Sequence, residues 1–196
     1  MVLATAKRYT VAEYLALEEQ AEFKSEFLDG EILPMAGASA NHNILTGKFH
    51  ARILLALEDL DCSVFMSDMR LWMPDYNRYT YPDVMVTEGN PIFTDAKQTA
   101  VTNPCLIVEI LSDFTEERDR SSKFKYYRSI PTFREYILIE QNSYGVEQYT
   151  KQKDGKWLLT EYLETNAILK MESVNFEIGL QDLYKRVDFG EIETKP

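Results

Sequence analysis

Residues 104–112 of the chain read PCLIVEILS, and this stretch decides the fold. Five large aliphatic residues in it surround a single acid, Glu109. A near-continuous apolar run of this length is typical of a central β-strand that is buried on both faces. Glutamate is rarely buried without a partner. The stretch therefore predicts a sheet with this strand at its centre, and an acid that is compensated by an arginine or by a metal ion.

Helix and strand patterns alternate on both sides of this strand. The tetrapeptide TVAE at 10–13 has the form of a capping box, which predicts a helix from 10 to about 19. Asp29-Gly30 and Asp154-Gly155 suit the tight turns of two β-hairpins. The hairpins are expected at 23–35 and 144–163, further helices at 40–60, 113–129 (with Asp113 as N-cap) and 180–187, and further strands at 62–73, 80–87, 105–111, 135–139 and ending at 176. Together these elements predict an α+β fold with a mixed β-sheet flanked by helices.

The length of 196 residues suits one domain with a real core, and no linker or repeat divides the chain. We therefore expect a single domain over residues 1–196, with residues 190–196 frayed. No apolar run approaches the roughly 20 residues that span a bilayer, and the start lacks a long apolar signal core. A cytoplasmic protein without a membrane partner is therefore expected.

The formal net charge is −11, and the isoelectric point is near 4.7. Proteins that wrap nucleic acid by bulk charge need clusters of Lys and Arg, so this charge counts against that class of protein. Cys62 and Cys105 lie in apolar, strand-like runs, where buried free thiols are expected. Only His42 and His50 are available to join them as ligands, which disfavours a zinc site.

A second acid, Asp83, lies within the strand expected at 80–87. Because strand side chains alternate, Asp83 is expected to share a face with Tyr81 and Met85. An ionised carboxylate beside apolar neighbours costs free energy unless a local partner or a metal ion compensates it. Both kinds of compensation stay open for Asp83.

Asp83 and Glu109, on neighbouring strands, could hold one Mg²⁺ through oxygen ligands, with the carbonyl of Ile110 as a third oxygen. Lys123 follows on a predicted helix, and two interpretations of it stay open. It could form a plain pair with Asp119, four residues earlier, worth roughly 0.2–0.5 kcal/mol. It could instead reach over the end of the sheet toward the two acids. Two carboxylates and a lysine form the usual apparatus for metal-assisted cleavage of a phosphodiester.

Two further acids could converge on the same place: Glu26 in the first hairpin, and Asp68 on the strand before Asp83. His42 opens the long helix, where a capping or surface role is expected. The irregular stretch 87–103 could flank a site. The sequence contains no nucleophile elbow, reactive cysteine context or phosphate-cradling glycine loop, so covalent catalysis and a P-loop find no support.

In this order, these residues resemble the Uma-two family of restriction-endonuclease-like proteins, within the PD-(D/E)XK nuclease superfamily. The resemblance covers roughly residues 9 to 185. The segments that carry it are EYL (13–15), SEFLDGEI (25–32), His42, SDMRL (67–71), YPDV (81–84), VEILS (108–112), DRSSK (119–123), Tyr127 and EY (135–136).

The resemblance implies a restriction endonuclease-like core, a Mg²⁺ or Mn²⁺ site on Asp83 and Glu109, and a homodimer. The lysine that the superfamily places two residues after the glutamate is replaced here by Leu111. In this family a lysine from the following helix substitutes for it, and that lysine is Lys123. Its ammonium would orient the attacking water or stabilise charge on the phosphate. Glu26 is implied as an accessory ligand or base.

The leading hypothesis is therefore a Mg²⁺-dependent endonuclease that hydrolyses DNA phosphodiester bonds. Its catalytic residues would be Asp83, Glu109, Lys123 and Glu26. Two alternatives stay open. One is a non-catalytic module that keeps the nuclease fold and binds protein partners, which the acidity favours. The other is a hydrolase of smaller phosphodiesters, which needs fewer basic contacts.

Overall fold

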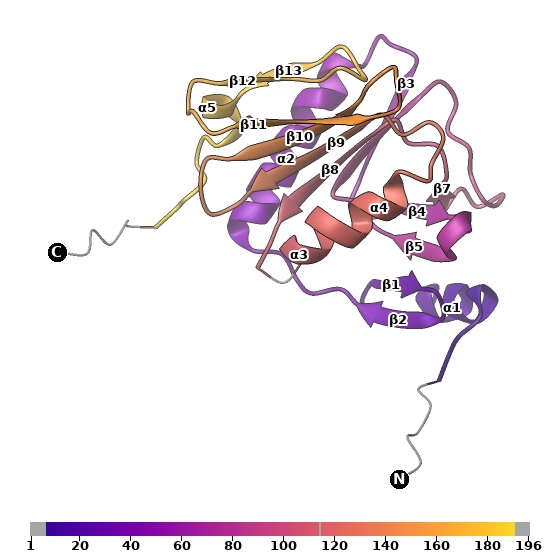
Figure 1. The fold of residues 1–196 in the computed structure, drawn as a ribbon. Coiled ribbons are helices and arrows are strands. Elements are labelled where there is room, and N and C mark those ends of the chain that lie inside the picture. The colour runs from indigo at the N-terminus through magenta and orange to yellow at the C-terminus, as the bar shows by residue number, and fades with distance from the viewer. Residues whose placement is uncertain (1–6, 114, 191–196) are drawn as a thin grey trace.

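The computed structural model describes residues 7–113 and 115–190 (Figure 1). Residues 191–196 of the segment expected to fray lie outside them. The described part contains a six-stranded sheet, a five-stranded sheet and a two-stranded sheet, with helices packed against them. The α+β class with mixed sheet and flanking helices is confirmed. None of the described helices is both long and apolar enough to cross a membrane.

The six-stranded sheet has the order β11-β10-β9-β8-β6-β3. Its strands are β3 (Cys62–Met66), β6 (Val84–Glu88), β8 (Leu106–Leu111), β9 (Glu135–Glu140), β10 (Val146–Lys151) and β11 (Trp157–Tyr162). β8 and β9 run parallel and all other neighbours in this sheet run antiparallel, so the sheet is mixed. β8 is the strand that PCLIVEILS predicts, and every residue in it is buried.

The two faces of this sheet carry different layers (Figure 1). One layer consists of α2 (Ala40–Ala56), α5 (Leu180–Leu183) and the hairpin of β12 (Ile168–Lys170) and β13 (Glu177–Gly179). The other consists of a broken helical segment: α3 (Glu116–Arg118), a π-helical turn (Asp119–Lys123) and α4 (Phe124–Tyr127). Even-numbered residues of β8 pack in the first core, and Ile107 and Leu111 pack in the second. Glu109 therefore points toward the helical segment.

The five-stranded sheet has the order β2-β1-β5-β4-β7. Its elements are β1 (Ser25–Leu28), β2 (Glu31–Pro34), β4 (Arg70–Met73), β5 (Arg78–Thr80) and β7 (Ala100–Val101), with a short 3-10 turn at Pro74–Tyr76 and α1 (Val11–Glu18) packed against β1. The predicted capping box of Thr10 and Glu13 is formed at the start of α1. Asp29 and Gly30 both have positive φ, 51° and 94°, as the predicted tight turn requires.

The strand predicted at 62–73 is wrong, because this stretch is divided between two sheets. β3 lies in the six-stranded sheet and β4 lies in the five-stranded sheet. The chain turns between them at Ser67, whose φ is 36°. The N–H of Ser67 donates to the carbonyl of Asp83, so this turn lies beside the next break in the chain.

That next break divides the strand predicted at 80–87. β5 ends at Thr80 and β6 begins at Val84, in different sheets. Pro82 lies between them and has no N–H with which to continue a ladder. Asp83 therefore lies in a connection between sheets, and its predicted place on one strand face with neighbouring residues is wrong.

Several predicted helix ends are also corrected. α2 ends at Ala56, four residues early, because Glu58, Asp59 and Asp61 put negative charge at the negative end of the helix dipole. α5 ends at Leu183 and not at 187, and the chain then turns through Arg186, whose φ is 72°.

The helix predicted at 113–129 begins later than expected. Thr115 stands at its cap position, but its side chain does not accept from the helix backbone, and the carboxylate of Asp113 accepts from Asn142 instead. Phe176 precedes β13 and does not end a strand. Both predicted hairpins and the strand at 135–139 are confirmed, and both thiols are free. Cys105 is buried as predicted, but Cys62 is only partly buried, so its predicted burial is wrong.

Glu135, at the start of β9, is fully buried and ties the loop after β12 to the sheet. Its carboxylate accepts from the backbone N–H groups of Glu172 and Ser173, from the Ser173 hydroxyl and from the Gln148 amide.

We expect Glu135→Ala to lower the free energy of unfolding by about 1–3 kcal/mol, because these donors lose their acceptor. Urea denaturation would measure the change. The exposed Glu172→Ala is the control and should stay within about 0.5 kcal/mol; equal losses in the two variants would contradict this role.

Candidate active site

Asp83 and Glu109 meet where the chain passes from one sheet to the other. Asp83 Oδ2 accepts a hydrogen bond of 2.8 Å from the N–H of Ile110, on β8. The N–H of Asp83 in turn donates to Glu109 Oε2 over 3.4 Å. These reciprocal contacts bring the two carboxylates to one place, as predicted. The prediction placed Asp83 on a strand next to that of Glu109, whereas Asp83 lies in the connection between the two sheets.

Glu109 is 3% exposed and has two donors on its other oxygen. Glu109 Oε1 accepts from Lys123 Nζ at 3.1 Å and from the Tyr127 hydroxyl at 2.6 Å. Burial is the main cause that raises the pKa of Glu109, and Asp119 and Asp83 add to it, while Lys123 acts in the opposite direction. The compensating cation is thus a lysine and not one of the arginines.

Lys123 lies among three carboxylates. Its Nζ is 2.8 Å from Asp119 Oδ1, 3.1 Å from Glu109 Oε1 and 4.0 Å from Glu26 Oε1, and its side chain is 12% exposed. Burial lowers the pKa of Lys123, but Glu109, Asp119 and Glu26 outweigh burial and raise it overall. Both interpretations of Lys123 are therefore present together, because it pairs with Asp119 and also reaches the sheet.

Asp119 is a buried part of this site that the sequence reasoning used only as a local partner of Lys123. It is 1% exposed. Its Oδ1 forms an ion pair with Lys123 but lacks a hydrogen bond of good geometry from any described residue. Asp119 begins the π-helical turn that ends at Lys123, and such turns often occur at functional sites. The i,i+4 spacing was the available signal, but burial could not be read from it.

Glu26 converges on the site from β1, as the sequence suggested. Its carboxylate forms an ion pair with Arg118 and accepts from the Thr80 hydroxyl. Burial alone would raise the pKa of Glu26, but Lys123, Thr80 and Arg118 together lower it. Asp68 does not converge: its side chain is 89% exposed and pairs with Lys24, because the turn at Ser67 directs it away.

His42 is where the sequence reasoning was wrong. A capping or surface role was expected, but Ser39 is the N-cap of α2, and the ring of His42 is largely buried with Nε2 3.1 Å from Asp83 Oδ2. Burial lowers the pKa of His42, whereas the hydrogen bond and charge of Asp83 raise it above its usual value. No local signal marks this contact, because it depends on the connection that carries Asp83. Tyr127, which contacts Glu109, likewise matched the family pattern, but the sequence reasoning assigned no role to it.

Comparison with known proteins adds a family to this geometry. The sequence profile of Uma2, described as "Putative restriction endonuclease", matches residues 11–181. The chain belongs to the Uma2 family. Two relatives are uncharacterized proteins of Synechocystis sp.: one is 53% identical, over 85% of this chain and 94% of its own length, and the other is 34% identical, over 90% and 92%.

A solved structure supports the Uma2 fold. It is the crystal structure, from Anabaena variabilis, of a protein described as "a putative nuclease belonging to DUF820". The TM-score is 0.74, with 18% sequence identity, over 90% of this chain and 97% of the other. At this identity the likeness is evidence for the fold alone, which the two chains share.

The oxygen donors of this Uma2 site fit a Mg²⁺ or Mn²⁺ ion. The described residues include no group of three His, Cys, Asp or Glu side chains placed to hold a metal, so they do not fit a closed zinc site. Mg²⁺ often takes only one or two carboxylates and completes its shell with water and substrate phosphates. None of the described residues donates to Asp83 Oδ1, and Glu109 Oε2 has only the long contact with the Asp83 N–H. The role of the Ile110 carbonyl stays a prediction.

The two thiols of the chain do not contribute a nucleophile. Burial raises the pKa of Cys105 to about 11, and burial together with nearby acids raises the pKa of Cys62. Because the thiolate is the reactive form, both thiols are poor nucleophiles at neutral pH.

Glu26 gives a pH-dependent prediction. Its folded pKa is lowered, so it stabilises the fold above its unfolded pKa of about 4.5 and loses that contribution as the pH falls through the folded pKa. We expect Glu26→Gln to lower the free energy of unfolding by about 1–3 kcal/mol at pH 7, where a charged group loses its partners, and by much less at pH 3. Urea titrations at both pH values, with the exposed Glu31→Gln as control, would measure this. A loss of equal size at pH 3 would contradict the ionised role of Glu26.

Proposed function

We propose that this chain is a Mg²⁺- or Mn²⁺-dependent endonuclease that hydrolyses phosphodiester bonds in DNA. The observation that carries the proposal is the 3.1 Å contact of Lys123 Nζ with Glu109 Oε1, beside an Asp83 whose N–H contacts the other oxygen of Glu109. Metal-assisted hydrolysis of a phosphodiester uses ligands for a divalent ion and positive charge near the phosphate. The description of the Uma2 family supports the same reaction class.

Each residue of the site has a part in this reaction. Asp83 and Glu109 would hold the divalent ion through their carboxylates. When bound, the ion supplies positive charge beside the scissile phosphate. Lys123 keeps its proton among its carboxylate neighbours, so its ammonium can donate to the attacking water or to a phosphate oxygen. Glu26, fixed by Arg118 and Thr80, holds the ammonium on its far side.

The net charge of −11 supports a second candidate. A chain with few clustered cations gains little from bulk attraction to DNA. A hydrolase of smaller phosphodiesters would need only the Asp83, Glu109 and Lys123 set, and a non-catalytic module that binds protein partners would not need the set at all.

The test is cleavage of supercoiled and linear DNA by chelator-treated protein, with and without added Mg²⁺ or Mn²⁺. Metal-dependent nicking is expected, and Asp83→Asn should slow it by about 100-fold or more, because the ion loses a ligand. Asp75→Asn, an exposed acid on the turn before β5, is the control. Hydrolysis of a small diester such as bis(p-nitrophenyl) phosphate without DNA cleavage would favour the second candidate. DNA cleavage that survives substitution of Asp83, Glu109 and Lys123 would end the proposal.

The homodimer implied by the family resemblance is part of the same proposal. Light scattering of the purified chain at micromolar concentration would measure its mass. A mass near 45.6 kDa, twice the 22.8 kDa of one chain, is expected.

A further inference from the structure

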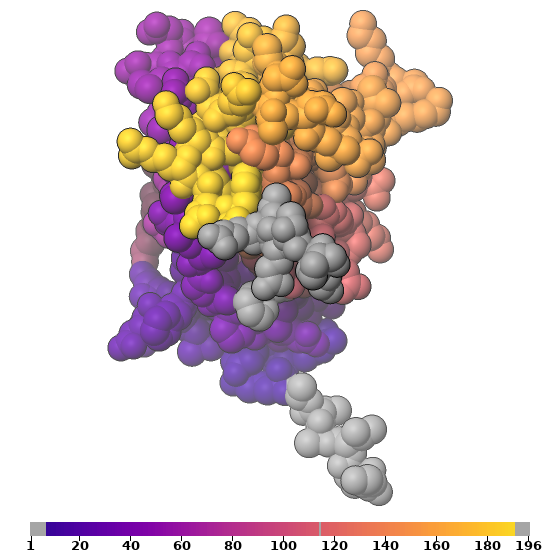
Figure 2. Space-filling model, turned by 90° about the vertical axis from the view of Figure 1, so that its left-hand side faces the viewer, coloured from indigo at the N-terminus to yellow at the C-terminus, as the bar shows by residue number. Residues whose placement is uncertain are grey.

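Four cations gather where α2 packs against α5. Lys48 and Arg52 lie one turn apart on α2, and Lys185 and Arg186 follow directly after α5. The ammonium of Lys48 donates to the carbonyl of Lys185, which joins the two pairs. Figure 2 views the molecule from this side, where the yellow C-terminal region lies against the purple of α2. We call these four residues the α2–α5 seam.

The seam is a cluster of four positive charges. None of its four cations forms an ion pair with any residue in the described ranges, although many other lysines and arginines of the chain do. Burial lowers the pKa of Lys48, and Arg186, Lys185 and Arg52 lower it further, while Asp182 opposes them. Like charges at this spacing repel one another. The seam is therefore a local cluster of cations in a chain of net charge −11.

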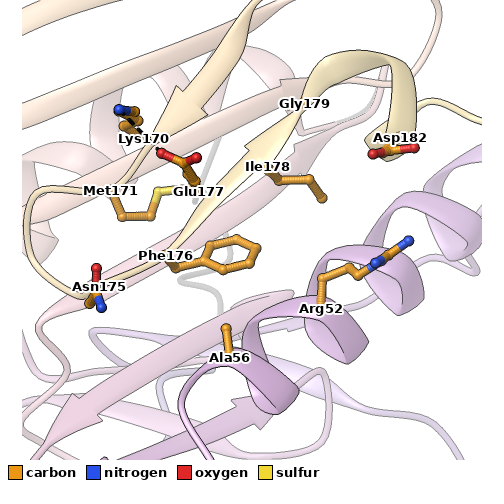
Figure 3. A pocket seen from close by; sticks show the side chains of 10 residues that line it. All are labelled: Arg52, Ala56, Lys170, Met171, Asn175, Phe176, Glu177, Ile178, Gly179 and Asp182. Atoms are coloured by element: carbon orange, nitrogen blue, oxygen red, sulfur yellow. Dashed lines mark ion pairs between the residues drawn. The ribbon is translucent and has the colours of Figure 1, made fainter.

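A polar recess adjoins the seam. It has a volume of about 550 Å³ and is lined by Arg52 from α2, Asp182 from α5, and the β12–β13 hairpin (Figure 3). Arg52 and Asp182 lie toward one side of it, and the ion pair of Lys170 and Glu177, 3.2 Å long, lies toward the other. Arg52 therefore borders both the seam and a hollow in the surface.

The same helix links the seam to the candidate active site. His42, in the first turn of α2, is 3.1 Å from Asp83. At a rise of about 1.5 Å per residue, Lys48 and Arg52 follow His42 by about 9 Å and 15 Å along the helix axis. A DNA duplex carries about one negative charge per 1.7 Å of its axis. A duplex whose scissile phosphate lies at Asp83 carries further phosphates at spacings comparable to the axial separations of Lys48 and Arg52 from His42, and to reach the seam it would have to pass along the α2 side of the sheet.

We propose that the α2–α5 seam binds backbone phosphates of DNA that flank the cleaved bond; the choice of DNA as the ligand rests on the proposed function. Lys and Arg side chains without ion-pair partners can donate to phosphate oxygens without breaking an ion pair. A local cluster also lets an acidic protein hold a polyanion without bulk positive charge. Binding at the seam needs no divalent ion.

The test is the salt dependence of binding to a fluorescein-labelled 30-base-pair duplex, followed by anisotropy in EDTA. The slope of log K against log salt is negative, and each phosphate contact that is lost reduces its magnitude by about 1. The double variant Arg52→Gln/Arg186→Gln changes two exposed side chains and should reduce the magnitude of the slope by about 2. Adding Lys48→Gln and Lys185→Gln should reduce the magnitude further. The matched control is Lys151→Gln/Lys153→Gln on the β10–β11 hairpin, which removes the same charge and should keep the slope of the wild type.

The outcomes separate this inference from the proposed function. Wild-type slopes in the seam variants, together with metal-dependent cleavage, would overturn the seam and leave the nuclease standing. Seam-dependent binding without cleavage under any divalent ion would support the seam and overturn the nuclease. If the control lowers the slope as much as the seam variants do, the effect is bulk charge and the seam is refuted. Millimolar inorganic phosphate could also raise the melting temperature of the wild type and not of the Arg52→Gln/Arg186→Gln variant. If duplex binding does not depend on the seam in that case, the result would overturn the DNA proposal in favour of a small-phosphate site.

Discussion

Lys123→Met is expected to lower the free energy of unfolding at pH 8 by about 3–5 kcal/mol, because it removes one partner from a buried set of charges. Glu109, Asp119 and Glu26 would then share a largely buried place without their common cation. The pKa values of Glu109 and Glu26 would rise, and groups with a raised folded pKa are most favourable at low pH. The loss should therefore be smaller at pH 5 than at pH 8. Chemical denaturation followed by circular dichroism at both pH values would measure it.

Lys125→Met is the matched control for this prediction, since Lys125 is exposed two residues later in the same helical segment and forms no ion pair with a described residue. Its change should stay within about 0.5 kcal/mol. A Lys123→Met protein as stable as the control at pH 8 would show that the ammonium does not hold the three acids together. If Lys123 also serves the proposed reaction, the variant should lose DNA cleavage even at the pH where it is most stable.

Glu109→Gln is expected to slow the proposed cleavage by about 100-fold or more without unfolding the protein. The amide keeps the size of the side chain and an oxygen for the Tyr127 hydroxyl, but it is a poor ligand for a hard divalent ion. Nicking rates in Mg²⁺, and metal binding by calorimetry, would measure the loss. Glu147→Gln, on β10 beside Arg120, removes the same charge away from the site and should cleave at the wild-type rate.

The same variant should change how stability depends on pH. Burial raises the folded pKa of Glu109 to about 8, against an unfolded value near 4.5. The wild type therefore loses stability from this group as the pH rises between those values, by up to about 1.4 kcal/mol per pH unit. Glu109→Gln lacks that group, so its stability relative to the wild type should rise from pH 5 to pH 8. A relative stability that falls with pH would contradict the raised pKa.

Local chemistry explains why much of the fold could be predicted from the sequence. Leu106–Leu111 is apolar except for Glu109 and is buried on both faces of the sheet. Asp29-Gly30 and Asp154-Gly155 supply the backbone conformations that their hairpins need. The alternation of side chains wrongly predicted one strand at 62–73 and one at 80–87, because such a pattern does not reveal that the chain passes from one sheet to another midway.

The residues of the candidate site could likewise be predicted only in part from the sequence. Glu109 stood out from its apolar neighbours alone, whereas Asp83 and Lys123 gained their meaning from the ordered resemblance. His42 was missed and Asp68 was wrong for one reason: both depend on where the chain turns at Ser67 and beside Asp83. Contacts made by irregular connections leave no periodic trace in a sequence.

The origin of Lys123 bears on how such proteins are found in genomes. The position two residues after Glu109 holds Leu111, which is buried in the core beneath the helical segment. A text search for glutamate, any residue and lysine would therefore pass over this chain. A three-dimensional template of two carboxylates with an ammonium 3.1 Å from one of them would recover it, whichever segment supplies the lysine. For proteins of this kind, distance between side-chain atoms is a better query than spacing along the chain.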